Sequence, residues 1–311
     1  MPHICRYGYI VISKRKMKKK AIVSVISVIC VIAVAVGIFA GCSSKKSDSN
    51  TSNSAQKGAI TVISREEGSG TRDAFTELMG IMDDSGNDAT AQSAEITNST
   101  SVMMSTVQGN KNAIGYVSLG SLSDSVKALK LDGAEASVET IKNGSYKLQR
   151  PFNIAYIDGS LSKEAQDFIK FITSKEGEAI ITKEGYIGID ATESYTASKM
   201  SGTVTLAGST SVAPVMNVLA DEYKKLNPGM KIEIQESGSS AGIESAMQGA
   251  VNIAMSSREL KNNEAAKLKS QKIALDGIAV IVNKENKLDN ITSAQVKDIF
   301  LGNTTTWDAI K

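Results

Sequence analysis

Histidine is almost absent from this sequence of 311 residues, and its only copy is His3, near the N-terminus. The rest of the chain therefore has no imidazole for acid-base catalysis, for hydrolysis by a Ser-His pair or for binding a metal ion. The two adjacent carboxylates Glu66 and Glu67 do not replace it, because neighbours on an extended segment point to opposite sides. The sequence predicts no catalytic residue, no metal site and no cofactor, and so a protein that is not an enzyme.

Cysteine is scarce as well, since the chain has only Cys5, Cys30 and Cys42. The first two precede the mature chain that we predict below, and a single remaining cysteine cannot form an internal disulfide. Stability must then come from burial of apolar side chains, for which the roughly 250 residues after the linker are sufficient.

A surplus of basic residues is missing too. Seven of the 35 Lys and Arg residues lie in residues 1–41, which leaves 28 against 33 acidic residues in the remainder. Nucleic-acid binders need a basic stripe to neutralise phosphates, and this mildly acidic remainder does not supply one. We therefore expect no nucleic-acid partner.

The N-terminus does contain one long apolar run. Three lysines follow Met17, and after them comes AIVSVISVICVIAVAVGIFAG up to residue 41. This is the pattern of a secretory signal. We assign residues 1–41 to a signal peptide and take Met17 as the better translation start, because residues 1–16 do not follow the signal pattern. An uncleaved membrane anchor is the alternative, since about 20 apolar residues can span a bilayer.

Cys42 favours a lipid anchor. Small residues directly before it and a polar stretch after it resemble a bacterial lipoprotein signal, in which Cys42 would receive lipid, such as palmitate, and become the first mature residue. Residues 42–58 are rich in Ser, Asn and Lys and have no apolar periodicity, so we expect a flexible tether. The predicted location is the extracytoplasmic face of the cell membrane.

From residue 59 onward, short β-branched runs alternate with amphipathic stretches, which predicts an α/β fold on a mostly parallel sheet. Strands are expected at 59–64, 113–119, 203–208, 231–236, 252–256 and 273–283. Helices are expected at 71–82, 162–184 with a break near Glu176-Gly177, 211–226, 241–248 and 293–300. Residues 185–202 would join two halves.

Three strands run into a turn rich in Gly, Ser and Thr and then into a helix, at residues 64–71, 208–211 and 237–242. Such a turn presents backbone N–H groups and hydroxyls at the positive end of a helix, where an anion can bind. An ordinary helix N-cap is the alternative for each turn taken singly. Three similar turns together favour one site for a tetrahedral oxyanion.

Arginines accompany two of the predicted strand ends. Arg65 lies in the first turn, and its planar fork suits two oxygens of an oxyanion. An ion pair with Glu66 or Glu67 is the alternative, and the two interpretations are compatible if a glutamate orients the fork. Arg258 is either a second anion ligand or a solvated residue at the start of a helix.

Six segments are similar to one known family: ISREEGSGTRDAF, AIGYVSLG, AGSTSVAPV, ESGSSAGIESA, IAMSSREL and IALDGIAVIVN. They resemble the phosphate-binding proteins of Pst-type ABC importers over essentially all of residues 57–311. The resemblance implies a two-lobed clamp of the type II periplasmic-binding-protein class, with the ligand held between the lobes at helix N-termini.

The order of these segments differs from the order usual in that family, where the AGSTS-like segment comes first. The resemblance therefore predicts a circular permutation in which the usual ends are joined through residues 186–202 and Ala59–Ser64 lies beside the C-terminal segment. A rearranged or tandem fragment is the alternative. One lobe would comprise residues 59–150 and 277–311 and the other residues 151–276, with Gly277 as a candidate flexing point.

The resemblance also implies the ligands. Matched motif by motif, the phosphate-binding residues would be Arg65, Ser69, Gly70, Thr71, Thr210, Ser211, Ser239 and Ser257. Some family members carry an aspartate where this chain has Ser257. A carboxylate there accepts the hydrogen of phosphate and repels fully ionised sulfate, so its absence weakens the case for phosphate unless Glu67 replaces it.

The sequence thus predicts a lipid-anchored solute-binding protein that captures inorganic phosphate for the permease and ATPase subunits of an ABC importer. One alternative is the same clamp with another oxyanion, such as sulfate or molybdate. The other is a surface sensing or interaction protein without transport.

Overall fold

The computed structural model describes residues 56–310. The predicted signal peptide, Cys42 and most of the predicted tether lie outside the described residues. Between residues 56 and 310, no helix is both long enough and apolar enough to cross a membrane.

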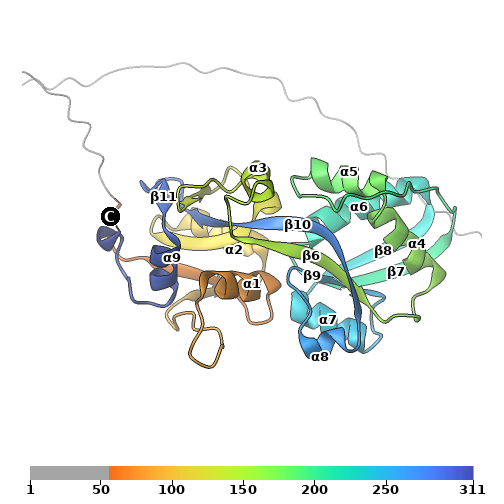
Figure 1. The fold of residues 1–311 in the computed structure, drawn as a ribbon, viewed down its shortest axis with the longest axis horizontal. Coiled ribbons are helices and arrows are strands. Elements are labelled where there is room, and N and C mark those ends of the chain that lie inside the picture. The colour runs from red at the N-terminus through yellow and green to blue at the C-terminus, as the bar shows by residue number, and fades with distance from the viewer. Residues whose placement is uncertain (1–55, 311) are drawn as a thin grey trace, which may run out of the picture. The chain divides into compact units, whose positions relative to one another are not determined.

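Strands and helices alternate along the described chain, as expected for an α/β fold (Figure 1). The strands are β1 (Thr61–Arg65), β2 (Glu95–Thr97), β3 (Ala113–Ser118), β4 (Lys127–Ala128), β5 (Lys130–Leu131), β6 (Gln149–Tyr156), β7 (Ser201–Gly208), β8 (Gly229–Glu236), β9 (Ile253–Ser256), β10 (Lys269–Val282) and β11 (Asn290–Ile291). The helices are α1 (Gly70–Met79), α2 (Thr100–Gly109), α3 (Val138–Lys142), α4 (Lys163–Ile172), α5 (Lys175–Lys183), α6 (Ala213–Leu226), α7 (Ser239–Met247), α8 (Asn262–Ala265) and α9 (Ser293–Phe300).

The main sheet has the strand order β2-β1-β3-β10-β6-β9-β7-β8, with β4 paired to β10. Its two ends are parallel, because β1 pairs with β2 and β3, and β7 pairs with β8 and β9, in the same direction. The middle is antiparallel, where β10 pairs with β3, β4 and β6, and β6 with β9. The prediction of a mostly parallel sheet is therefore wrong, because two strands cross the middle in opposite directions.

Those two strands, β6 and β10, cover the segments where the sequence predicts extended crossings. They pair from Lys269–Tyr156 to Gly277–Gln149, and β10 then continues along β3. One long strand is thus shared between the two ends of the sheet (Figure 1).

Apolar side chains form two large buried clusters. The first is built from residues 62–148 and 278–307, and in it the rings of Phe75 and Tyr116 stack with centroids 4.0 Å apart. The second is built from residues 152–274 and contains Phe152, Phe168 and Tyr223. We call them core 1 and core 2. Core 1 draws on both ends of the described chain, whereas core 2 is continuous in sequence.

The long helix expected over residues 162–184 is broken into α4 and α5, and the expected break near Glu176-Gly177 is confirmed, a few residues earlier. The break falls at Thr173-Ser174, because the hydroxyl of Ser174 accepts a hydrogen bond from the backbone N–H of Gly177 at 3.2 Å and so caps α5. Gly177 itself lies in the first turn of α5.

The start and the end of the described chain pair with each other. Ala59 forms an antiparallel bridge with Thr306, and the backbone N–H of Ile60 donates to the carbonyl of Thr305 at 2.8 Å. The backbone N–H of Trp307 donates to the carbonyl of Gly58 at 2.9 Å. The predicted neighbourhood of Ala59–Ser64 and the C-terminal segment is confirmed at its start, for Ala59 and Ile60, whereas the following residues pair with β2 and β3.

Candidate functional site

Arg65 is the last residue of β1, and the fold holds both its backbone and its side chain. Its backbone N–H donates to the hydroxyl of Tyr116 at 3.0 Å, and its carbonyl accepts from Nη1 of Arg72 at 2.8 Å. Burial raises the pKa of Tyr116 to about 12, so its hydroxyl stays neutral. Arg65 is also only 2% exposed. These backbone contacts and its burial fix the position of the guanidinium.

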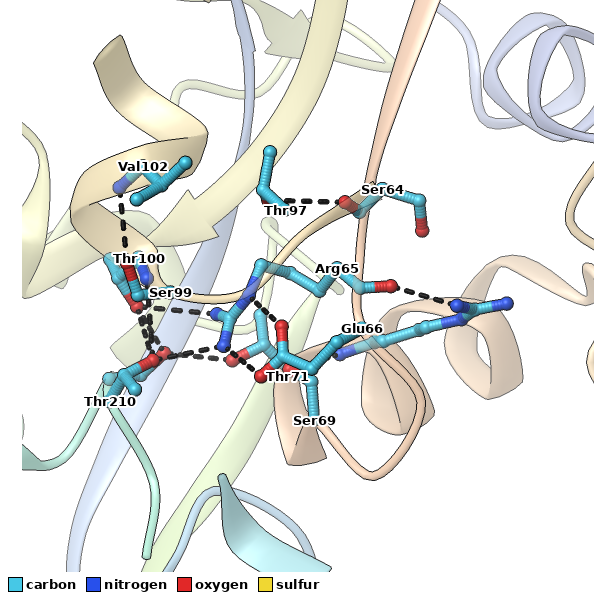
Figure 2. A network of polar contacts seen from close by, with 12 residues as sticks. Ser64, Arg65, Glu66, Ser69, Thr71, Thr97, Ser99, Thr100, Val102 and Thr210 are labelled. Carbon is cyan, nitrogen blue, oxygen red and sulfur yellow. Dashed lines mark hydrogen bonds and ion pairs between the residues drawn. The ribbon is translucent and has the colours of Figure 1, made fainter. Parts of the chain in front are cut away.

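The two edges of this guanidinium face different partners (Figure 2). On one side, Nε and Nη2 each donate to a carboxylate oxygen of Glu66 at 2.8 Å. On the other side, Nη2 donates to Oγ1 of Thr210 at 2.9 Å and Nη1 to Oγ1 of Thr100 at 3.3 Å. Glu66 thus orients the fork toward a group of hydroxyls, as the sequence analysis allows, whereas Glu67 is exposed.

Hydroxyls from separate segments meet beside Arg65. Oγ1 of Thr71 lies 2.8 Å from Oγ of Ser211, and Oγ1 of Thr100 lies 3.2 Å from Oγ1 of Thr210 and 3.1 Å from Oγ of Ser211. Thr71 and Thr100 come from core 1 elements, and Thr210 and Ser211 precede α6, whose residues belong to core 2.

A second group of hydroxyls adjoins the first. Oγ of Ser257 lies 2.9 Å from Oγ of Ser209 and 3.3 Å from Oγ of Ser239. Gly70 packs directly on this group, since a Cβ at Gly70 would lie 2.4 Å from Oγ of Ser239 and 2.9 Å from Oγ of Ser257. A side chain at Gly70 would force the two segments apart. We call the two groups together with Arg65 the hydroxyl cluster.

Helix capping accounts for only some of these serines. Ser69 is an ordinary N-cap of α1, because its Oγ accepts from the backbone N–H of Arg72 at 3.4 Å. Ser209 caps the turn before α6 by accepting from the backbone N–H of Ser211 and of Val212. The hydroxyl of Ser239 instead accepts from the backbone N–H of Ser257 at 3.2 Å and caps nothing.

The residues predicted from the sequence are thus brought together: Arg65, Thr71, Thr210, Ser211, Ser239 and Ser257 are linked by hydrogen bonds or lie next to Gly70 and Ser69. Arg258 is not part of this group. It is only 6% exposed, Nη1 and Nη2 donate to Glu264 at 2.7 and 2.8 Å, and Nε lies 2.9 Å from Oδ2 of Asp73. Both interpretations of Arg258, an anion ligand and a solvated residue, are wrong, because two carboxylates hold it.

Sequence reasoning missed Thr100 and Ser209. Thr100 follows β2 in the turn Asn98-Ser99-Thr100, which has hydroxyls but no glycine and so does not match the other turns. The hydroxyls of this turn are the only local signal for Thr100, because neither β2 nor α2 is among the elements predicted from the sequence.

The cluster is suited to an anion and not to a metal ion. The helices α1, α2, α6 and α7 all begin at or next to it, and each directs the positive end of its dipole there. Arg65 adds a full positive charge. Between residues 56 and 310, no three His, Cys, Asp or Glu side chains are grouped so that they could hold a metal ion. Neutral donors around one arginine can bind an oxyanion at several oxygens at once.

Comparison with known proteins gives a consistent set of relatives. A model of the PBP superfamily domain matches residues 31–176 and 193–310. Phosphate-binding protein PstS 2 of Streptococcus agalactiae serotype V is 49% identical over 296 residues, which cover 94% of this chain and 98% of that protein. PstS 2 of Streptococcus pneumoniae serotype 4 is 50% identical over 267 residues, which cover 85% of this chain and 91% of the relative.

A solved structure is similar as well. The phosphate-binding protein of a phosphate ABC transporter from Streptococcus pneumoniae TIGR4 is 51% identical and superimposes with a TM-score of 0.66, over 82% of this chain and all of that one. Because the match to the S. agalactiae protein spans nearly the whole of both chains, that relative has the same order of segments. A permutation relative to other members of the family stays a prediction.

Proposed function

We propose that this chain captures inorganic phosphate and passes it to an ABC importer. The proposal rests on its family, because the chain belongs to the PstS-type phosphate-binding proteins of the PBP superfamily. The relatives that establish the family are binding proteins of transporters. The protein would accordingly bind its ligand and release it without changing it chemically, and have no enzymatic activity.

The observation that carries this proposal is the hydroxyl cluster around Arg65. An inorganic oxyanion accepts hydrogen bonds on every side, so its binding site needs donors from several directions. Arg65 and Thr71 approach from core 1 elements, and Thr210 and Ser211 approach from the turn before α6, a core 2 element. Ser239 approaches from α7, whose apolar residues pack in a smaller separate cluster. Beyond His3 the chain has no imidazole to act as a general base, and the carboxylate of Glu66 beside the cluster is held by Arg65.

The proposed domain organisation follows from the two cores. Residues 59–150 and 277–311 would form one lobe and residues 151–276 the other, with β6 and β10 as the crossings about which the lobes close. Support comes from the composition of cores 1 and 2. The surroundings of Gly277 favour a packing role over a role as a flexing point. A Cβ at this position would lie 2.5 Å from Cδ1 of Ile141, so close packing there requires glycine.

The proposed location is the extracytoplasmic face of the cell membrane. Cys42 would carry the lipid, and residues 42–58 would tether the binding unit near the permease and ATPase subunits that receive phosphate. The support for this step is the lipoprotein-like signal in the sequence. Metabolic labelling with radioactive palmitate tests it, because Cys42→Ala should abolish incorporation of the label.

Calorimetric titration of the purified full chain, freed of bound anion, tests the main proposal. We expect saturable binding of phosphate and, for Arg65→Ala, a loss of about a hundredfold or more in affinity, because several charge-assisted hydrogen bonds disappear. Lys147→Ala, which removes an exposed charge, is the control and should bind as the wild type does. A wild-type chain that is folded but does not bind phosphate would contradict the proposal.

Sulfate is the second candidate ligand, because position 257 is a serine and offers no carboxylate to repel it. The same titration with sulfate separates the two. Binding of sulfate and not of phosphate would replace the proposed ligand but keep the proposed site.

A further inference from the structure

The first turn of α2 reaches the hydroxyl cluster because of the way β1 and β2 pair. These strands are parallel, and Arg65 is in register with Thr97. Parallel strands end at the same edge of a sheet, and each here leads into a helix, α1 after β1 and α2 after β2. Thr100 therefore lies at the same edge as Thr71, three residues beyond the strand partner of Arg65.

The side-chain hydrogen bonds of Thr100 go to residues of the cluster. Its Oγ1 lies 3.3 Å from Nη1 of Arg65, 3.2 Å from Oγ1 of Thr210 and 3.1 Å from Oγ of Ser211. Its backbone N–H donates to Oγ1 of Thr210 at 3.3 Å, and the residue is 5% exposed. Figure 2 shows Thr100 beside the guanidinium of Arg65 and next to Thr210.

Helix capping does not use these groups. Ser99 is the N-cap of α2, and its Oγ accepts from the backbone N–H of Val102 at 3.2 Å. The backbone N–H of Thr100 is one of the first-turn donors that have no partner inside the helix. Thr100 thus offers two hydrogens, one from the backbone and one from the hydroxyl, at the positive end of a helix of ten residues.

The hydroxyl of Thr100 shares one hydrogen bond with the hydroxyl of Thr210 and another with that of Ser211, and a hydroxyl can serve as donor or as acceptor. An oxyanion only accepts. When one binds among them, each hydroxyl can turn its hydrogen to the anion at little cost, since hydroxyl hydrogens rotate freely.

We propose that Thr100 is a further phosphate-contacting residue, and that α2 is a further helix whose N-terminus faces the anion. This inference rests on the proposed function, since it adds a ligand to that same site. It also enlarges the contribution of core 1, so that the anion is held by two turns from that side, one at Thr71 and one at Thr100.

A purely structural role for Thr100 is the competing explanation, because its hydroxyl also links Arg65 to Thr210. Thr97 supplies the matched control. It is buried, it lies in the same segment, and its Oγ1 donates to the carbonyl of Ser64 at 3.1 Å, yet it makes no hydrogen bond to the cluster residues Thr210 and Ser211. Thr97→Val and Thr100→Val each remove one buried hydroxyl and keep the shape of the side chain.

The experiment measures the phosphate affinity of the full chain by calorimetry and its thermal midpoint without phosphate, for the wild type, Thr100→Val, Thr100→Ser and Thr97→Val. We expect Thr100→Val to bind phosphate about tenfold to a hundredfold more weakly, since a hydrogen bond to a charged group is lost. Thr100→Ser should bind within about threefold of the wild type. Thr97→Val should lower the thermal midpoint by a few degrees and leave affinity unchanged.

Unchanged affinity in Thr100→Val would overturn the inference. An equal loss of affinity in Thr97→Val and Thr100→Val would overturn it as well, because the effect would then pass through the fold. A wild type that is folded but does not bind phosphate would instead contradict the proposed function, so the two failures are distinguishable.

Discussion

Position 257 is where one side chain would bear on the choice of anion at the proposed site. Ser257 is 1% exposed and its hydroxyl is 2.9 Å from that of Ser209 and 3.3 Å from that of Ser239. A hydroxyl both donates and accepts, so it suits an anion with or without a hydrogen. Glu66, the carboxylate beside the cluster, is already engaged by Arg65. Among these residues there is therefore no free carboxylate that would repel sulfate.

Ser257→Asp should create that selectivity. Phosphate keeps at least one hydrogen near neutral pH and can donate it to the new carboxylate, whereas sulfate has none and is repelled. Because like charges in contact cost several kcal/mol, we expect sulfate affinity to fall at least about tenfold relative to phosphate affinity. Titrations with both anions measure the ratio, and Ser257→Asn is the uncharged control. Equal losses for the two anions in Ser257→Asp would contradict this prediction.

The residues of the site were predictable where a turn carried glycine, and not where it did not. Gly68 and Gly70 mark the turn after β1, and Gly208 and Gly238 mark two others, so the turns were expected as anion sites from the sequence, and the resemblance to a family then implied Thr71, Ser211 and Ser239 within them. Thr100 was not, because its position depends on the register of β2 with β1, a long-range pairing that no local pattern contains.

Among the elements, the crossing strands β6 and β10 carry a buried ion pair. Arg150 and Asp276 are register partners, and Nη2 of Arg150 donates to Oδ2 of Asp276 at 3.1 Å. Oγ of Ser118 in β3 donates to Oδ1 of Asp276 at 2.9 Å, and Nη1 of Arg150 donates to the carbonyl of Ser257 at 3.3 Å. Burial nevertheless raises the pKa of Asp276, since loss of water outweighs the attraction of Arg150. The pair connects both crossings to the hydroxyl cluster.

Asp276→Asn should cost about 3–5 kcal/mol of unfolding free energy, because it leaves the buried charge of Arg150 without its partner. Urea unfolding followed by circular dichroism measures the loss. Asp73→Asn is the matched control. It also removes a carboxylate from a buried arginine, but Arg258 keeps its two hydrogen bonds to Glu264, so the cost should be small. Similar losses in the two variants would contradict the prediction.

Local patterns predicted elements well where the start and the stop were clear in the sequence. β3 and α9 lie within a residue of their expected bounds for this reason. The helix α2 was missed, since its sequence TSVMMSTVQG is rich in Ser, Thr and Val, which have weak helical propensity. The prediction of a parallel sheet was wrong for the middle strands. Strand direction there depends on how two distant segments cross.

For the whole molecule, the pairing of the first and last described residues completes core 1. Trp307 is 2% exposed, its backbone N–H donates to the carbonyl of Gly58, and its ring N–H donates to the carbonyl of Asn112 at 3.1 Å. The predicted pairing of distant chain ends came from the resemblance to a family. Composition and periodicity alone carry no information about it.

Trp307→Ala should therefore destabilise the protein by about 3–5 kcal/mol, as expected for truncation of a buried tryptophan. Urea unfolding monitored by circular dichroism measures this, since the variant removes the only tryptophan. Leu226→Ala, at a position 38% exposed, is the control and should cost much less. A loss no larger than the control's would mean that the C-terminal segment contributes little to core 1.

The split of core 1 between the two ends of the chain also sets an order in time. A growing polypeptide emerges from its N-terminal end, so residues 62–148 are made first. Core 2 has all its residues once position 274 has been synthesised. Core 1 must wait for residues 278–307, and thus the part of the molecule that is made earliest is the last to obtain its full set of partners.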